Sequence, residues 1–579
     1  MVAAVLSLSP DNRRAVKEAL DYIEACQVSQ GIRAAFCRQI NAIVETGRQD
    51  GTRSLINKLF KHVDRAASHL FSPTDLRFAV DFENEYPEEI LKRGAVVAKV
   101  LSRDWEHNNT DITFSQGVFE SLKYGASILK QWVEKEPDGQ PTYSARLVMP
   151  WHFGVYREDV ADLDKQPAMC ETTLMSLPEV WKRVYHMPEA PTLFKRIKDH
   201  AQRGNTNTEF STFLHQVLST STLNTGNVGM TRPVPGGIVQ LNNDPNYAIM
   251  GPEVGVDLVK MHELWVWGDD GDYKTIQIIE PDVLITRYKR ENLLMGSRVK
   301  TRLHPYTLIQ PNAVTGYIWG RSEITDLIEP QGWLSTICVD IMRLAGLQVD
   351  KILAFSGFDG ITVETYDQMR SAGFFNGVAG SNVSDLTPKF PPEIIPLMEL
   401  VMSAIDSLGG FEALMQGKGE QGVRAGVHAN TLLKTGSPTL RDRSLIVERQ
   451  CASAAHLRLR MMEAKENRNF WTDGSSLKTI DDTSFTLSDL PVDYRVCVDG
   501  HSGSPIFADD HQQLIAFGLK AGFVDPDYAV DNLPFPNKER LHASIKKRAE
   551  QQQKMMAELQ KTDPEGFIKL LEKSGGHRR

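Results

Sequence analysis

Two helix patterns separated by a short segment with β character constrain this chain more than any other feature. The second pattern opens at Pro391-Pro392, where proline suits a first helical turn, and runs to about Leu408. In the first pattern we expect Ser322 to act as the N-cap and Pro330 to kink or restart the helix. When this helix is followed in heptad-like steps, its apolar residues lie near one face. They are Ile324, Leu327, Ile328, Leu334, Cys338, Ile341 and Ala345.

A glycine-rich stretch follows the second helix pattern. Residues 409–426 contain six glycines in eighteen positions, which predicts a flexible loop. A long helical pattern from His428 to Asn467 comes next, and Gly436-Ser-Pro438 must bend or break it. The order is therefore helix, small β unit, helix, glycine-rich loop and long helix.

The rest of the chain alternates between helical and β-prone regions, which predicts an α+β fold. Residues 11–136 are mostly helical in pattern, whereas residues 142–300 contain short runs of period two. Within these runs, Leu264 to Ile278 predicts a β-hairpin with Asp and Gly at its turn. Residues 204–251 predict a long excursion, either at a subunit contact or as a mobile surface loop. Residues 470–497 return to β, and helices resume from Ser502.

Length and charge limit the function. A chain of 579 residues exceeds the roughly 300 at which a single core stops growing, so several domains or one elongated subunit are expected. Its net charge of −9 has the wrong sign for tight, unspecific binding of nucleic acid. The six cysteines form no C-x-x-C pair, which favours reduced, buried thiols without zinc. No apolar run is long enough to span a membrane, so we expect folding in the cytosol.

Catalytic and metal motifs are weak. The segment Gly410–Gly419 departs from a phosphate-binding loop, because six residues separate its glycines and Gly419 replaces the Ser or Thr. His262-Glu263 lacks the second histidine of a zinc peptidase, and Asp269 to Asp272 predict a hairpin tip better than a cation site. A hydrolase with a dispersed active site that uses Ser502 and His501 is the enzymatic alternative, although adjacent residues do not build a triad. We therefore expect no catalytic residue, metal or cofactor.

The order of elements resembles that of the portal proteins of tailed bacteriophages, the ring-shaped head-to-tail connectors. Three stretches carry the resemblance: Pro305 with Tyr317–Gln331, which matches the family's G-x-S-x-[ILV]-x-x-[LI]-x-x-x-Q entry to its first stem helix; Val423–Leu433; and Val496–Pro505 followed by helices. The resemblance covers about residues 80–550. It implies an elongated α+β subunit with a helical stem, a mixed α/β wing, a small α/β clip and a helical C-terminal crown.

The family's parts can be placed on this sequence. The resemblance implies a wing at 1–318 and 425–500, stem helices at 319–347 and 391–408, a clip at 348–390, a tunnel loop at 409–424 and a crown at 501–579. It also implies a ring, usually of about twelve copies, at a capsid vertex of the virion, made and assembled in the host cytoplasm. Another viral structural protein, such as a tail adaptor, is the alternative within this class.

The resemblance further implies partners and channel residues. Double-stranded DNA would pass through the ring without sequence-specific contacts, and the partners would be the terminase, the major capsid and scaffold proteins, and tail adaptors, with no membrane. Carboxylates on the second stem helix would repel phosphates and let DNA slide. We expect Glu393, Glu399 and Asp406 there, and Lys418 and Arg424 of the loop near the phosphate backbone.

Overall fold

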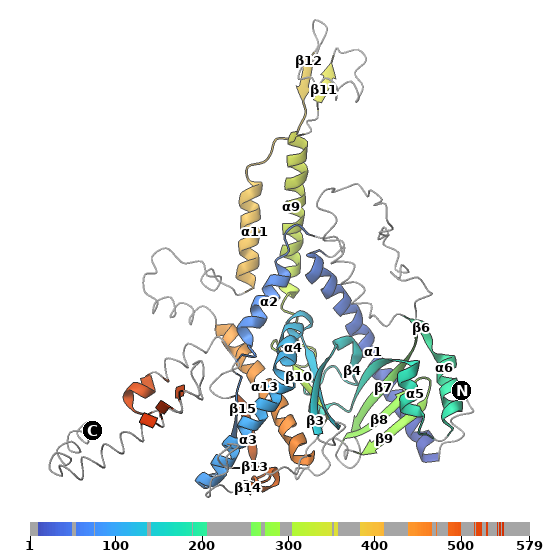
Figure 1. The fold of residues 1–579 in the computed structure, drawn as a ribbon. Coiled ribbons are helices and arrows are strands. Elements are labelled where there is room, and N and C mark those ends of the chain that lie inside the picture. The colour runs from blue at the N-terminus through green and yellow to red at the C-terminus, as the bar shows by residue number, and fades with distance from the viewer. Residues whose placement is uncertain are drawn as a thin grey trace, which may run out of the picture.

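The protein has a broad body from which a pair of helices projects, with a small β-hairpin at the far end (Figure 1). This computed structural model describes residues 10–48, 54–74, 76–135, 141–187, 189–204, 256–267, 273–289, 304–349, 353–356, 382–409, 438–465, 470–471 and 484–498, with a few positions between 515 and 548. The predicted α+β class is confirmed. The expected excursion at 204–251, the glycine-rich loop and most of the C-terminal segment lie outside the described residues.

The larger sheet of the body is antiparallel. Its order is β4 (Phe153–Val155), β5 (Ala168–Ser176), β7 (Val256–Trp267), β8 (Tyr273–Ile279) and β9 (Val283–Lys289), and β6 (Gln202–Gly204) also pairs with β7. The predicted hairpin is confirmed as β7 and β8, in which Trp267 lies opposite Tyr273.

Both faces of this sheet are covered, because strand residues alternate between its two sides. On one face Leu264 and Ile276 pack against α1 (Pro10–Thr46). On the other, Met261 and Val259 pack against α5 (Leu177–Val184) and α6 (Ala190–His200). The expectation of β structure throughout residues 142–300 is therefore wrong for α5 and α6. A capping box of Ser176 and Glu179 starts α5.

A second, three-stranded sheet has the order β10 (Tyr306–Ile309), β2 (Ser127–Lys135) and β3 (Pro141–Val148). The helices α2 (Leu59–Leu70), α3 (Glu88–His107), α4 (Thr110–Tyr124) and α13 (Pro438–Lys465) share the main hydrophobic core with it. α13 begins at Pro438, so of the expected helix from His428 only the part after the predicted break is described.

One strand pair joins distant parts of the chain, because β1 (Phe78–Phe82) pairs with β15 (Tyr494–Val498). β13 (Phe470–Trp471) pairs with β14 (Ser484–Phe485), which is close to it in sequence. Segments near both ends of the described chain therefore belong to one body. Short 3₁₀ helices complete it at Pro150–His152, Leu163–Lys165 and Leu487–Asp489.

The projecting pair consists of α9 (Ile328–Val349) and α11 (Ile394–Leu408), and the hairpin of β11 (Leu353–Ser356) and β12 (Asn382–Asp385) lies between them in sequence. Both predicted helices are observed. Pro330 does not interrupt α9, because it lies in the first turn, where a backbone N–H has no helical partner. The prediction that Ser322 caps the helix is wrong: its hydroxyl donates to the Lys123 carbonyl, and a 3₁₀ turn (Thr325–Leu327) precedes α9.

The cysteines are free thiols: five are buried, as expected, and Cys497 is partly exposed. Within the described part of the chain, no helix combines the length and apolar character that a bilayer crossing requires.

Candidate functional site on the projecting helices

The base of the projecting pair is held by polar contacts with the segment between α1 and α2. The Gln331 side chain accepts a hydrogen bond from Lys58 N (3.1 Å) and donates one to the Ile56 carbonyl (2.7 Å). The hydroxyls of Ser335 and Ser54 lie 2.7 Å apart. These contacts fix where α9 leaves the body, so the direction of the pair is set by the fold.

A buried carboxylate, Glu323, lies at the same base, just before α9. Arg443 of α13 donates to both of its oxygens (3.0 and 2.9 Å), and Asn312 donates to one (2.8 Å). His62 Nε2 of α2 lies 3.6 Å from Oε1. The His62 ring also packs against Gly409, where an added Cβ would lie 2.2 Å from the ring. Glu323 thus joins the bases of both projecting helices to α2 and α13.

The environment of Glu323 shifts its pKa strongly. Burial raises the pKa of the carboxyl, but the contact with His62, the charge of Arg443 and the bond from Asn312 outweigh burial and lower the pKa from 4.5 to about 2. Folding therefore stabilises the ionised form. The contribution of the ionised Glu323 to the free energy of unfolding is fully present above about pH 5. It is lost as the pH falls through the folded-state pKa.

Replacing Glu323 by Gln is expected to lower the free energy of unfolding at pH 7 by on the order of 3 kcal/mol, the equivalent of the pKa shift. As the pH falls from 5 to 2, wild type should lose the stability that the ionised Glu323 contributes, and the variant should not show this loss. Denaturant unfolding across that range is the measurement. Asp326→Asn is the control, since Asp326 forms an exposed ion pair with Arg321 and little change is expected. Equal acid sensitivity of Glu323→Gln and wild type would contradict the assignment.

α11 is apolar over more than half of its circumference, and its polar residues Glu399, Ser403, Asp406 and Ser407 share the remaining face. Ten of its fifteen residues are Ala, Val, Ile, Leu or Met. Val401 and Ile405 are buried in the main core, where Leu334 and Cys338 of α9 also lie. An apolar face of this width is normally buried. In this chain, however, one side of α11 has no cover from the described residues.

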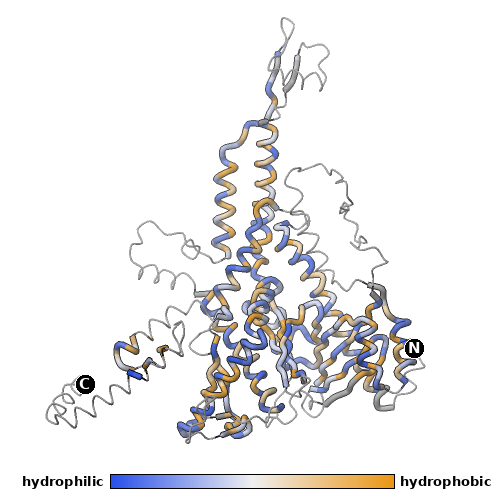
Figure 2. The backbone as a smooth tube through the Cα atoms, in the orientation of Figure 1, coloured by the Kyte–Doolittle hydropathy of each residue, from blue (hydrophilic) through white to orange (hydrophobic). Residues whose placement is uncertain are grey.

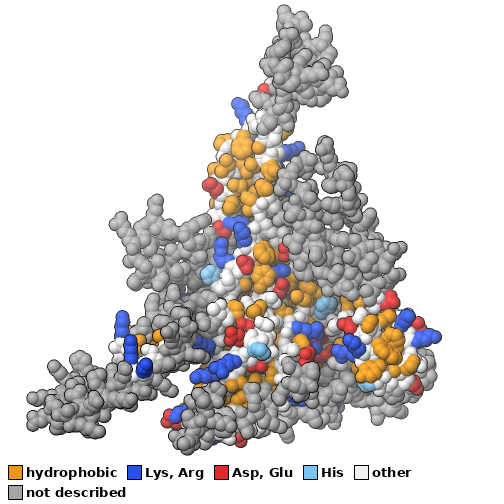
Figure 3. All heavy atoms as spheres, in the orientation of Figure 1, with side chains coloured by type: hydrophobic (Ala, Val, Ile, Leu, Met, Phe, Trp, Pro, Cys, Tyr) orange, Lys and Arg blue, Asp and Glu red, His pale blue; other side chains and the backbone are white. Residues whose placement is uncertain are grey.

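The exposed apolar residues of α11 include Leu397, Leu400 and Leu408, which are 47%, 66% and 58% exposed. Their spacings of three and eight place them within one face, beside the buried Val401 and Ile405, and we call these three residues the α11 stripe. On α9, Trp333, Val339 and Met342 are also exposed. Figures 2 and 3 show hydrophobic residues along both helices and at the surface of the pair. Exposed apolar surface of this kind marks an interaction site.

The predicted channel residues occupy different environments. Glu393 and Glu399 are exposed, before and within α11. Asp406 is half-buried, and its carboxylate lies 2.6 Å from Lys58 Nζ, so its charge is paired within the chain. Lys418 and Arg424 lie outside the described residues, and so do His501 and Ser502 of the enzymatic alternative.

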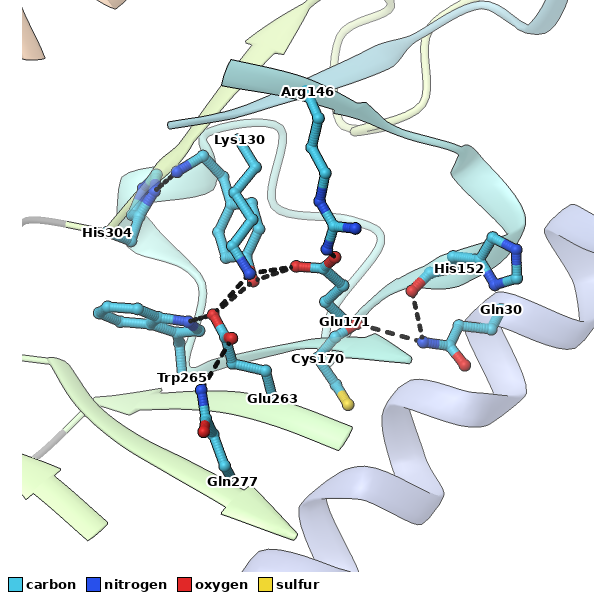
Figure 4. Close-up of polar contacts among 11 residues, drawn as sticks. Gln30, Lys130, Arg146, His152, Cys170, Glu171, Glu263, Trp265, Gln277 and His304 are labelled. Atoms are coloured by element: carbon cyan, nitrogen blue, oxygen red, sulfur yellow. Dashed lines mark hydrogen bonds and ion pairs between the residues drawn. The ribbon is translucent and has the colours of Figure 1, made fainter. Parts of the chain in front are cut away.

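A buried charge network lies between the two sheets, and no local sequence pattern indicates it (Figure 4). Lys130 Nζ of β2 is 2.6 Å from Glu171 of β5 and 2.8 Å from Glu263 of β7. Glu171 also pairs with Arg146, and the Tyr306 hydroxyl donates to Glu171 (3.0 Å). The network therefore ties the three-stranded sheet to the larger one.

The protonation states in the network follow from these contacts. Burial raises the pKa of Glu263, but the charge of Lys130 and hydrogen bonds from Lys130, Trp265 and Gln277 outweigh burial and lower it. Burial and the two carboxylates raise the pKa of Tyr306. Glu263 is thus held ionised beside the Lys130 ammonium group. We interpret the network as a structural clamp, because its members bond to one another.

His262, considered as half of a zinc motif, has other partners. Its Nε2 lies 3.1 Å from Glu280 and its Nδ1 lies 3.0 Å from the Thr172 hydroxyl. In the described part of the chain, no group of three His, Cys, Asp or Glu side chains is placed to hold a metal ion.

Comparison with known proteins gives little further guidance. No protein-family model matches the chain. No curated protein matches it either. Among solved structures, the chain is similar to one described as "Virion of native gene transfer agent (GTA) particle", with 12% sequence identity, a TM-score of 0.37, and coverage of 86% of this chain and 94% of that chain. At this identity and TM-score, the likeness supports no conclusion about the present chain.

Proposed function

We propose that this chain is a non-enzymatic portal subunit: it assembles into a ring at a capsid vertex of the virion, and double-stranded DNA passes through that ring. The single observation that carries the proposal is the α11 stripe on a helical pair that projects from the body. The order of the elements, helix, β-hairpin and helix, followed by a glycine-rich sequence, agrees with the resemblance to portal proteins.

A ring explains the stripe physically. Contact with α9 and the body buries Val401 and Ile405 of the wide apolar face, but no described residue covers the stripe, and a neighbouring copy would provide that cover. α11 has 15 residues and is about 22 Å long, shorter than the roughly 30 Å of a hydrocarbon core, so a bilayer crossing does not provide it. In a closed ring each copy covers the same surface of its neighbour. Neighbouring pairs would then form the wall of a channel.

DNA handling is the second part of the proposal. The net charge of −9 and the exposed carboxylates of Glu393 and Glu399 favour weak contact with phosphates, which suits DNA that must keep moving. Lys418 and Arg424 would provide local contacts with the DNA backbone. Terminase, the major capsid and scaffold proteins and tail adaptors are the partners that we propose for the assembled ring.

The double variant Lys418→Gln, Arg424→Gln tests this function. We expect it to form rings like wild type, but to reduce the amount of DNA packaged or retained in particles, because two phosphate contacts per copy are lost. Lys99→Gln, Lys520→Gln removes the same charge from other parts of the chain and is the control. The measurements are ring formation and DNA content per particle. Wild-type DNA content in the first variant would contradict the role of the loop, and a wild type that forms no ring would contradict the portal proposal.

A further inference from the structure

The helices α5 and α6 carry an exposed surface of aromatic and basic side chains. Val180 and Val184 are buried against the sheet, whereas Trp181 and Tyr185 are 41% and 62% exposed. Trp181 packs edge-on against Phe194, with ring centroids 5.1 Å apart, so the aromatic side chains are held in place. Lys182, Arg183, Lys195 and Lys198 are exposed around them. We call these six exposed residues, without Phe194, the aromatic–basic face.

This face lies on a segment of net positive charge, although the chain as a whole is acidic. Residues 177–200 contain five Lys or Arg and three Asp or Glu, whereas the whole chain has a net charge of −9. Figure 3 shows hydrophobic side chains over α5 and α6 with Lys and Arg beside them. A surface that combines exposed aromatic residues with excess positive charge suits a partner that is acidic and partly apolar.

The same chain presents such a surface. The segment Asp81–Glu89, which we call the acidic turn, contains five Asp or Glu and no Lys or Arg. Glu83 and Glu85 are exposed, and nearby Leu91 on the first turns of α3 is 49% exposed. The acidic turn therefore offers both carboxylates and an apolar side chain.

The acidic turn is held rigidly by β15 and its neighbour Asp493. Asn84 donates to the Asp493 carboxylate (2.6 Å), and so does the Tyr86 hydroxyl (3.0 Å). The rings of Phe82 and Tyr86 pack edge-on at 5.5 Å. A preformed surface loses little conformational freedom when it binds, which favours its use as a contact.

The two surfaces lie on different sides of the body. In Figure 1, α5 and α6 are at one side, whereas α3 and β15, which bound the acidic turn, are toward the other. Complementary surfaces on different sides of one subunit form a head-to-tail contact, and such contacts close into a ring when the rotation between copies allows it. A second copy of this chain is therefore the partner that fits.

We propose that the aromatic–basic face of one copy binds the acidic turn of the next copy, at the level of the body. This inference rests on the proposed ring and adds a second contact to it, distinct from the α11 stripe. Because the charged residues are exposed, the contact should weaken as the salt concentration rises. It would also fix the relative orientation of neighbouring copies, since surfaces of like charge repel.

A charge swap tests the contact. Lys182→Glu, Arg183→Glu and, separately, Glu83→Lys, Glu85→Lys are each expected to raise the half-assembly concentration at least about tenfold, because like charges then face each other. All four substitutions in one chain should restore assembly to within about threefold of wild type, because the pairing is re-formed with reversed signs. Lys99→Glu, Arg103→Glu makes the same change in net charge as Lys182→Glu, Arg183→Glu, at exposed positions of α3, and is the control. Sedimentation velocity across a concentration series gives the midpoints, and thermal unfolding checks each fold.

The outcomes separate this inference from the proposed function. Two impaired reversals with rescue in the combined variant would support the contact. A wild type that forms rings while both reversals behave like the control would overturn the contact and leave the ring intact. Impairment without rescue would also overturn it, and would assign the aromatic–basic face to another acidic partner, such as nucleic acid. A wild type that never assembles would overturn the ring and this contact together.

Discussion

A chain that carries Leu397→Glu and Leu400→Glu is expected to fold but to remain monomeric under conditions in which wild type assembles. Both side chains are exposed in the isolated subunit, so their carboxylates stay hydrated there and affect stability little. In an assembled ring the same carboxylates would be buried without partners, at several kcal/mol for each unpaired charge. Repeated at every contact, this penalty exceeds what an interface of two helices can offset.

Native mass measurement and circular dichroism test this prediction together. The double variant should show the mass of one chain and the helix content of wild type. Leu397→Met, Leu400→Met keeps the stripe apolar and should assemble. If the glutamate variant assembled as well as wild type, the α11 stripe would not lie in a subunit interface.

Replacing Lys130 by Met is expected to give the largest loss of stability. Lys130 is the cation between Glu171 and Glu263, and without it two buried carboxylates face each other while Arg146 pairs with Glu171. Removing one partner of a buried ion pair lowers the free energy of unfolding by about 3 to 5 kcal/mol. The pKa of Glu263 should rise in the variant, so its deficit relative to wild type should be larger at pH 8 than at pH 5.

Denaturant unfolding at the two pH values measures this effect. Lys92→Met is the control, because the Lys92–Glu88 pair is exposed and its loss should leave the unfolding midpoint almost unchanged. Adding Glu263→Gln to Lys130→Met should recover part of the stability, since it removes one unpaired charge. A deficit for Lys130→Met as small as that of the control would contradict the clamp.

The elements with strong local periodicity could be predicted from the sequence. α9, α11 and the β7–β8 hairpin each have a repeat of apolar residues and turn or proline signals at their ends. α5 was missed although Ser176 and Glu179 form a capping box, which is a readable signal for a helix start. Ser322 fits the pattern of an N-cap, but in the folded chain its hydroxyl donates a hydrogen bond to the Lys123 carbonyl instead.

The candidate site could be predicted only in part. The location of α11 followed from its pattern, but which of its apolar faces lacks cover depends on how it packs on α9 and the body. Glu171 lies 41 residues after Lys130, and Glu263 lies 92 residues after Glu171, so no local pattern connects these three side chains. The same holds for β1 and β15, which pair across more than 400 residues. Such contacts depend on the complete fold.

Imaging of the assembled wild-type chain along its symmetry axis tests the portal proposal most directly. Class averages should show a closed ring of about twelve copies, with a central opening wide enough for a DNA duplex and the projecting helices around it. Particles that remain single chains at every concentration, or that form open filaments without a central opening, would contradict it.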